Sequence, residues 1–507
     1  MSDPRAKGFR EFLRHNLWWL VALLLALVLL PRGVVTEAEL NRTKPDGKDD
    51  SKWTEYLVYK LAAARMREGT SINAIDLKGS LHPDKLGQEE FEAERARWQV
   101  EYQRLLHVEI SPNTAYRLHE HAYSYPPLWA LLAVPLDALG NFNIEVVIWH
   151  FLVVASLAVA ARIAFLLLFE GRGQPPPEVK RGFKAWLTTP QGIGVSACVI
   201  AFGYLLGPVS NQQNDSMVFA FVMLGALALR RERSWLAGLC FGLAAFSKGP
   251  LLLLLPWLCF KRRWLSALAT FAFGLGFSLL PDLFFPANSG KLYLYEWYEI
   301  GLKPLLSSGE AAASSTAWFR FNELNQSLGA TLDRLFGLRE AGRDVLPALV
   351  EIPDKARKYL TYGLYLILML AALAIARVVR VSAKSIFAKP AMPFVVAPSG
   401  RGLVLELSLV MILACLLSPM TSPPHLCVLI APLLLMLDEA WQTRARWLVG
   451  LTIFAALPML FVHKDLAGRD FVTTLRFYGI SVWVMLAMFA GLAMIAKRHR
   501  NTEANTP

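Results

Sequence analysis

The chain has 507 residues, of which 55% are hydrophobic and only 18% are charged, and its mean hydropathy is +0.38. Soluble globular proteins carry about 25% charged residues, so this composition excludes a compact water-soluble fold and predicts an all-α polytopic membrane protein. The formal net charge of +12 would suggest nucleic acid as a partner in a soluble protein. In a membrane protein it is typical of cytoplasmic lysines and arginines that set the orientation, so nucleic-acid binding is set aside.

Apolar stretches recur along the whole chain, and a helix needs roughly 20 mostly apolar residues to cross a bilayer. The first stretch follows basic residues as in a signal peptide, but no small-residue cleavage site follows it, so we expect a retained signal anchor. The sequence predicts about twelve transmembrane helices, at 16–33, 144–169, 190–209, 215–229, 234–247, 249–260, 264–286, 359–380, 403–418, 424–438, 447–462 and 475–496.

Four of the loops between these stretches, at 170–189, 230–233, 261–263 and 439–446, and the C-terminal tail are basic. If they are cytoplasmic, the predicted spans alternate without conflict and both termini lie inside. The residues that set this orientation are Arg172, Lys180, Arg181, Lys184, Arg230, Arg231, Arg233, Lys261, Arg262, Arg263, Arg444, Arg446, Lys497, Arg498 and Arg500.

The apolar stretch 123–139 does not fit this alternation, because a thirteenth span would reverse every later loop. We therefore predict a helix along the outer interface, which suits Tyr123, Tyr125 and Trp129, with an ordinary span as the alternative. The resulting division is 1–33 (cytoplasmic N-terminus and first transmembrane helix), 34–143 (large first exterior loop with interfacial helices), 144–286 (transmembrane core), 287–358 (second exterior loop) and 359–507 (C-terminal transmembrane helices and cytoplasmic tail).

The first exterior loop has the periodicity of two helices, at 52–68 and 88–106. In the second of them, Glu94 and Arg97 are spaced to pair. Between residues 34 and 121 there are 16 acidic and 13 basic side chains, so this loop is close to neutral. The basic excess of the chain therefore belongs mainly to the other side of the membrane.

Three carboxylates, Asp49, Asp50 and Glu55, lie at or just before the 52–68 helix. A carboxylate near the membrane surface could act as a general base that takes the proton from an acceptor hydroxyl. The same residues would also suit the start of a helix, because Ser51 or Asp50 is a good N-cap and acids stabilise a first turn.

Two polar clusters interrupt the apolar core. The run 210–215, with Asn214 and Asp215 at its end, could bind sugar hydroxyls or a metal-bridged phosphate, or could form a plain polar hairpin tip. Lys248 precedes Gly249 and Pro250, which end a helix, and a lysine at that depth is expected to bind an anion such as phosphate. A snorkelling or carboxylate-paired lysine is the alternative.

Two more clusters lie on the exterior side. Residues 322–327, which include Asn325 and Gln326, are followed by Arg334, and the run 418–425 ends in His425. That histidine could transfer a proton or bind a phosphate oxygen, or could be structural. Together the clusters predict one exterior-facing site. No motif demands a metal or another cofactor, although a divalent cation would suit these ligands.

The order of these motifs resembles the GT-C membrane glycosyltransferases, and most closely glycosyltransferase family 87. The resemblance runs from about residue 50 to 440. It rests on WTEYLVYKLAAARMREG, on YPPLWALLAVPL, on the stretch from NQQNDSMVF to FSKGP and KRRW, on NQSL and on the SP…H run at 418–425. It implies a bacterial enzyme of the cytoplasmic membrane, with a GT-C-type fold and an active site that faces the periplasm. Its expected donor is a polyprenyl-phosphate sugar, typically of mannose or arabinofuranose, and its expected acceptor is an envelope glycan, glycolipid or lipid.

Carried over by position, the resemblance puts Glu55 where the family has its catalytic aspartate, which is a departure that leaves Asp50 as a second candidate base. The family's histidine pattern is also altered, so that only His425 remains. The residues expected to hold the phosphate or line the sugar pocket are Lys248, His425, Arg320, Arg334, Asn214, Asp215, Asn325, Gln326 and Tyr125.

Two other classes of protein fit parts of the pattern. A transporter or flippase for a lipid-linked saccharide would use the acids and Lys248 along a translocation path. A catalytically degenerate relative would keep the fold without the reaction. The large exterior loops and the one-sided polar clusters favour the enzyme, and no Gly-rich loop or Rossmann-like unit is present to bind a nucleotide sugar.

Overall fold

The computed structural model is helical throughout the residues that it describes, which are 4–43, 50–72, 88–120, 125–171, 183–299, 303, 322–337, 346–378 and 399–504. The helices of the N-terminal half are α1 (Pro4–Gly33), α2 (Glu37–Leu40), α3 (Tyr56–Arg67), α4 (Gln88–Leu106), α5 (Pro112–Glu120), α6 (Leu128–Asp137), α7 (Phe142–Leu168), α8 (Phe183–Leu187), α9 (Pro190–Ile200), α10 (Phe202–Asn211), α11 (Asp215–Arg230) and α12 (Ser234–Ser247). They are followed by η2 (Gly249–Leu253), α13 (Leu254–Phe260), α14 (Trp264–Phe284), α15 (Tyr293–Trp297), α17 (Leu328–Phe336), α18 (Asp354–Val378), α19 (Gly400–Leu417), η5 (Pro423–Leu429), α20 (Ile430–Thr443), α21 (Arg446–Phe461), α22 (Lys464–Ala467), α23 (Arg469–Phe477) and α24 (Ile480–Ala504).

Seven helices in the described part of the chain are long and apolar enough to cross a membrane. They are Val21–Leu40, Phe142–Leu168, Trp264–Phe284, Asp354–Ala376, Gly400–Leu417, Pro423–Thr443 and Ile480–Arg498. An eighth span results if α9 and α10, which meet at a bend of 58°, cross the membrane together. The protein is therefore a polytopic all-α membrane protein.

The part of the chain that the structure describes does not show about twelve membrane-spanning helices, as predicted, but seven or eight. The predicted spans at 215–229, 234–247, 249–260 and 447–462 fall on helices of 16 residues or fewer, which are shorter than the roughly 20 residues that a straight span needs. The predicted interfacial helix is α6, and its ten residues are also too few to cross a bilayer alone. Its position at the membrane surface stays a prediction.

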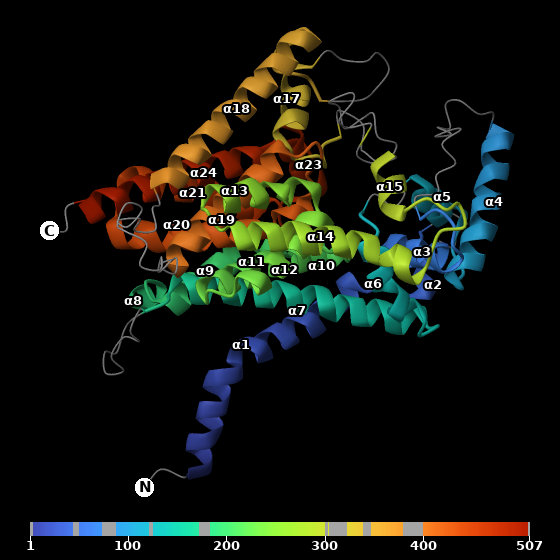
Figure 1. Ribbon diagram of the computed structural model, residues 1–507, viewed down its shortest axis with the longest axis horizontal. Coiled ribbons are helices and arrows are strands. Elements are labelled where there is room, and N and C mark those ends of the chain that lie inside the picture. The colour runs from blue at the N-terminus through green and yellow to red at the C-terminus, as the bar shows by residue number, and fades with distance from the viewer. Residues whose placement is uncertain are drawn as a thin grey trace.

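The centre of the bundle is formed by α19, α11 and α20. Almost all of α19 is buried, because its apolar residues surround the helix instead of forming a stripe, which is typical of a core helix. By contrast, the span in α18 is only 11% buried, and α18 diverges from the bundle along one edge in Figure 1. Its exposed apolar side chains fit contact with lipid.

The helices α2 to α6 gather at one end of the bundle (Figure 1). Both helices predicted in the first exterior loop are present, as α3 and α4, and Arg97 pairs with Glu94 at 3.6 Å. Helix α3 is buried over nearly its whole length and packs against α6. This packing positions the residues just before α3 and α6, Glu55 and Tyr125, for the site described next.

Candidate active site

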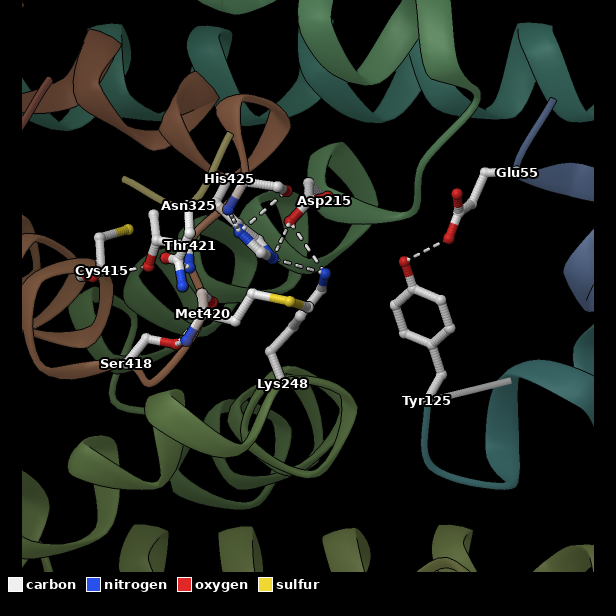
Figure 2. Close-up of polar contacts among 11 residues, drawn as sticks. Glu55, Tyr125, Asp215, Lys248, Asn325, Cys415, Ser418, Met420, Thr421 and His425 are labelled. Carbon is white, nitrogen blue, oxygen red and sulfur yellow. Dashed lines mark hydrogen bonds and ion pairs between the residues drawn. The ribbon is translucent and has the colours of Figure 1, made fainter. Parts of the chain in front are cut away.

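Lys248 is the residue around which the site is built. It follows the last residue of α12 and has an extended backbone, because Gly249 and Pro250 end the helix. Its side chain is 15% exposed, and its Nζ lies 3.2 Å from Asp215 Oδ1 and 2.8 Å from His425 Nε2 (Figure 2). Lys248 is therefore paired with a carboxylate, which was the alternative to anion binding for this lysine.

Asp215 reaches Lys248 because α11 and α12 form an antiparallel pair joined by residues 231–233 only. The first residue of α11, Asp215, and the residue after α12, Lys248, consequently meet at the same end of the pair. The opposite end carries the basic loop with Arg230, Arg231 and Arg233. The polar cluster 210–215 is thus part of a site that also includes Lys248.

His425 lies in η5, and its ring is oriented by Ser422, the residue just before that helix. The Ser422 backbone N–H donates to His425 Nδ1 at 2.7 Å, so the neutral ring carries its proton on Nε2. Nε2 lies 2.8 Å from Lys248 Nζ, and Asp215 Oδ1 lies 3.2 Å from Nζ and 3.4 Å from Nε2. The three side chains therefore form one cluster of two nitrogen atoms and a carboxylate.

Tyr125 links this cluster to Glu55. Lys248 Nζ lies 4.9 Å from the centre of the Tyr125 ring, in cation–π geometry, and the Tyr125 hydroxyl donates to Glu55 Oε1 at 3.0 Å (Figure 2). Burial raises the pKa of Tyr125 well above its usual value, and the charge of Glu55 adds to that shift. Tyr125 therefore stays protonated as the donor to the Glu55 carboxylate. Three contacts of 4.9 Å or less connect Glu55 to His425.

Of the two candidate bases, Glu55 is the one that joins the site. It immediately precedes α3, but its side chain makes no capping hydrogen bond to that helix, so the capping interpretation does not describe its carboxylate. Asp50 lies farther upstream and pairs with the exposed Arg42 at 3.2 Å.

Asn214 has the most unusual polar environment in the site. It is fully buried, yet neither its amide nitrogen nor its amide oxygen has a hydrogen-bond partner among the described residues. The neighbouring atoms Asp215 Oδ2 and Ser216 Oγ are also unpaired within that part of the chain. Buried polar groups are nearly always hydrogen-bonded, so these unpaired atoms make Asn214 and Asp215 candidates for ligand binding.

Asn325 and Gln326 brace the loop that carries His425. Asn325 Oδ1 accepts from the Thr421 N–H at 3.0 Å, and its Nδ2 donates to the Pro419 carbonyl at 3.0 Å. The Gln326 N–H donates to the Thr421 carbonyl at 2.6 Å. Both residues therefore support the 418–425 loop, and Figure 2 shows Asn325 beside Thr421 of that loop. The predicted Arg320 lies outside the described residues.

Arg334 is engaged in structure and not in the site. It is fully buried, and its Nε, Nη1 and Nη2 atoms donate to the carbonyls of Phe477, Asn322, Asn325 and Arg476 and to Thr331 Oγ1, at 2.7–3.4 Å. A guanidinium has five N–H donors, so none is left for a phosphate. The prediction that Arg334 holds the phosphate is therefore not supported. The sequence alone does not show that its donors are used by backbone carbonyls.

We expect Arg334→Lys to destabilise the protein without weakening donor binding. A lysine has three donors and cannot serve five acceptors, and each buried acceptor left unpaired costs about 1–3 kcal/mol. Thermal unfolding in detergent should show a lower midpoint, while the donor KM of the folded fraction changes less than about twofold. An unchanged unfolding midpoint with a donor KM about tenfold higher would show that Arg334 binds the donor.

A second set of buried charges lies next to the site and was not predicted from the sequence. Lys60 Nζ lies 2.5 Å from Asp137 Oδ1 and 2.8 Å from Glu145 Oε2, and Arg67 also pairs with Asp137. The available signal was Lys60 itself, a lysine in the apolar run after Glu55. No group of three or more His, Cys, Asp or Glu in the described part of the chain could hold a metal ion.

The protein is thus a multi-pass helical membrane protein with a lysine, a histidine and carboxylates clustered at one end of the bundle. The chain belongs to glycosyltransferase family 87, because the model of that family matches residues 123–419, more than half of the protein. It is therefore a GT-C-like membrane glycosyltransferase. No curated protein and no solved structure gives a significant match. The matched segment contains Tyr125, Asp215 and Lys248, whereas Glu55 and His425 lie outside it.

Proposed function

We propose that this glycosyltransferase transfers a sugar from a polyprenyl-phosphate donor to an envelope glycan, glycolipid or lipid acceptor. The observation that carries the proposal is the position of Lys248. Its amine contacts Asp215, His425 and the ring of Tyr125, and Tyr125 in turn binds Glu55. Lys248, the proposed anion ligand, and Glu55, the proposed base, therefore both contact Tyr125.

Lys248 and His425 are the proposed phosphate ligands. Their nitrogen atoms lie 2.8 Å apart, and the two side chains are only 15% and 17% exposed, so a charge-assisted hydrogen bond to them is stronger than in water. The phosphate oxygens would accept from Lys248 Nζ and His425 Nε2 and thereby compete with Asp215. Asn214 and Asp215 Oδ2, next to these donors, would bind sugar hydroxyls.

The proposed reaction is a direct displacement with Glu55 as general base. The acceptor hydroxyl oxygen forms a bond to the anomeric carbon while Glu55 takes the hydroxyl proton. The bond between the anomeric carbon and the phosphate oxygen breaks, and its electron pair leaves with polyprenyl phosphate. Lys248 stabilises the charge that develops on the leaving oxygen, and Tyr125 keeps the Glu55 carboxylate oriented by donating to it.

We further propose that the site faces the periplasm of a bacterial cytoplasmic membrane. Lys248 and Asp215 lie at the end of the α11–α12 pair opposite Arg230, Arg231 and Arg233. Basic residues in short loops favour the cytoplasmic side, so the other end of these helices is the exterior end.

The donor class is tested with purified protein in lipid nanodiscs. We expect transfer of radiolabelled mannose or arabinofuranose from the polyprenyl-phosphate sugar to a membrane-lipid extract, and no transfer from the matching nucleotide sugar. Transfer from the nucleotide sugar would refute the proposed donor. Movement of the donor lipid across proteoliposome membranes without transfer would favour the transporter.

Asn214→Leu should separate function from stability. The buried amide has no partner among the described residues, so an apolar side chain of similar size should leave the unfolding midpoint unchanged or higher. Transfer should fall about 100-fold if the amide binds the sugar, because one well-placed polar contact contributes on that order. A lower midpoint with normal transfer per folded molecule would show that Asn214 is structural.

A further inference from the structure

The buried charges around Lys60 lie where they can control the position of Glu55. Glu55 directly precedes α3, and Lys60 is in the second turn of that helix. Lys60 pairs with Asp137, the last residue of α6, and with Glu145, in the first turn of α7. The three side chains are 2% exposed or less.

The network ties α3 to the same helix that follows Tyr125. Tyr125 lies three residues before α6, so both partners of the Glu55–Tyr125 hydrogen bond are attached to helices that meet at Lys60. The Tyr56 hydroxyl donates to Glu145 Oε2 at 3.0 Å, which fixes the residue next to Glu55 as well.

The other side of Glu55 is fixed to the start of the Asp215 segment. The Glu55 N–H donates to the Asn211 carbonyl at 3.2 Å, and Thr54 Oγ1 donates to Gln212 Oε1 at 2.8 Å. Glu55 is thus attached upstream to the corner that leads to Asp215, and downstream, through Lys60, to α6 and α7.

The balance of charges explains why such a network can persist in the interior. Two cations, Lys60 and Arg67, face two carboxylates, Asp137 and Glu145, and Arg67, whose side chain is 35% exposed, connects the network to the surface. Buried ion pairs contribute little net stability compared with apolar packing, and their best-attested use is to fix register. Because ion pairs are directional and the hydrophobic effect is not, the network would fix the rotation of α3, and with it the position of Glu55, more specifically than apolar contacts alone.

We propose that Lys60 is a positioning residue, which holds Glu55 against Tyr125 by locking α3 to the end of α6 and the start of α7. The proposal rests on the role of Glu55 as the base in the proposed function. Lys60 itself touches neither substrate nor reacting atoms. Its contribution is the placement of a carboxylate, for which a displacement of about 1 Å can cost on the order of 100-fold in rate.

The test combines hydrogen exchange in nanodiscs with transfer kinetics for wild type, Lys60→Met, Lys60→Arg and Asp438→Asn. Asp438 is the matched control, because it is a fully buried carboxylate that pairs with Arg401 at the other end of the bundle. In Lys60→Met, the backbone amides of residues 55–59 should exchange at least about tenfold faster than in the wild type, because loss of the Lys60 ion pairs lowers the free energy of local opening at the start of α3. Its kcat should fall about 100-fold with a donor KM within about twofold.

Lys60→Arg keeps the positive charge, so its exchange rate at residues 55–59 and its kcat should stay close to those of the wild type. Asp438→Asn should change neither quantity. If Lys60→Met does not accumulate in the membrane, Tyr56→Phe replaces it. That variant keeps all four charges and removes one hydrogen bond, and it should show faster exchange at 55–59 and a kcat about fivefold lower.

Unchanged exchange at residues 55–59 in Lys60→Met, or faster exchange with an unchanged kcat, would overturn the proposal. The exchange result does not depend on the reaction. If the wild type transfers no sugar from any polyprenyl-phosphate donor, the proposed function fails, and exchange still decides whether Lys60 fixes the start of α3.

Discussion

Glu55→Gln is expected to lower the kcat of transfer by about 10²–10⁴-fold, the range that a general base contributes. Glutamine keeps the size of the side chain and can still accept the Tyr125 hydroxyl hydrogen bond, but it cannot take a proton at neutral pH. The donor KM should therefore change little. Single-turnover transfer from polyprenyl-phosphate sugar in nanodiscs measures this directly.

Asp50→Asn is the matched control for this substitution. Asp50 is the second candidate base from the sequence, but it pairs with Arg42, and its side chain is 36% exposed. We expect its replacement to change kcat by less than about threefold, as for a surface ion pair of small energy. The opposite pattern, with Asp50→Asn inactive and Glu55→Gln active, would identify Asp50 as the base.

Lys248→Met is the second large effect, and it should act on both catalysis and folding. Loss of one preorganised donor to the leaving group costs on the order of 10²–10³-fold in rate. The substitution also leaves the buried Asp215 carboxylate without its cation, which destabilises a protein by about 3–5 kcal/mol. The rate and the thermal unfolding midpoint of the purified variant should both fall.

Lys261→Met separates these two effects. Lys261 is 14% exposed and pairs with the buried Glu406, which closely matches Lys248 with its 15% exposure and its partner Asp215. Its pair lies with the basic loop at residues 261–263, away from the site. We expect a similar loss of stability with normal transfer per folded molecule. Equal loss of transfer in both variants would mean that Lys248 acts only through folding.

Local features of the fold were predictable because they depend on residues close in sequence. The 88–106 periodicity gave α4 with its bounds, and Gly249-Pro250 showed where α12 ends and why Lys248 is set apart from it. The number of full-length spans was not predictable in the same way. Short apolar helices such as α12 are stable only because α11 and α14 cover them, and hydropathy does not contain that packing.

The composition of the candidate site was predictable in part. Charged residues in an apolar chain are few, so Lys248, Asp215 and His425 were identifiable individually, and the structure shows that they meet. Arg334 was assigned to the wrong kind of contact, because its carbonyl partners lie in two segments, 322–325 and 476–477, the second of them more than 140 residues away in sequence. The Lys60 network was missed for the same reason, since Asp137 and Glu145 come from helices 77 and 85 residues away.

The site is tested most directly by a cryo-EM structure of the protein in nanodiscs with a polyprenyl-phosphonate sugar, a donor analogue that cannot react. We predict a phosphonate oxygen within about 3 Å of Lys248 Nζ and of His425 Nε2. The anomeric carbon should face the side of Tyr125 where Glu55 lies. A phosphonate bound elsewhere, for example beside Arg401 and Lys261 at the opposite end of the bundle, would contradict the assignment of this cluster as the active site.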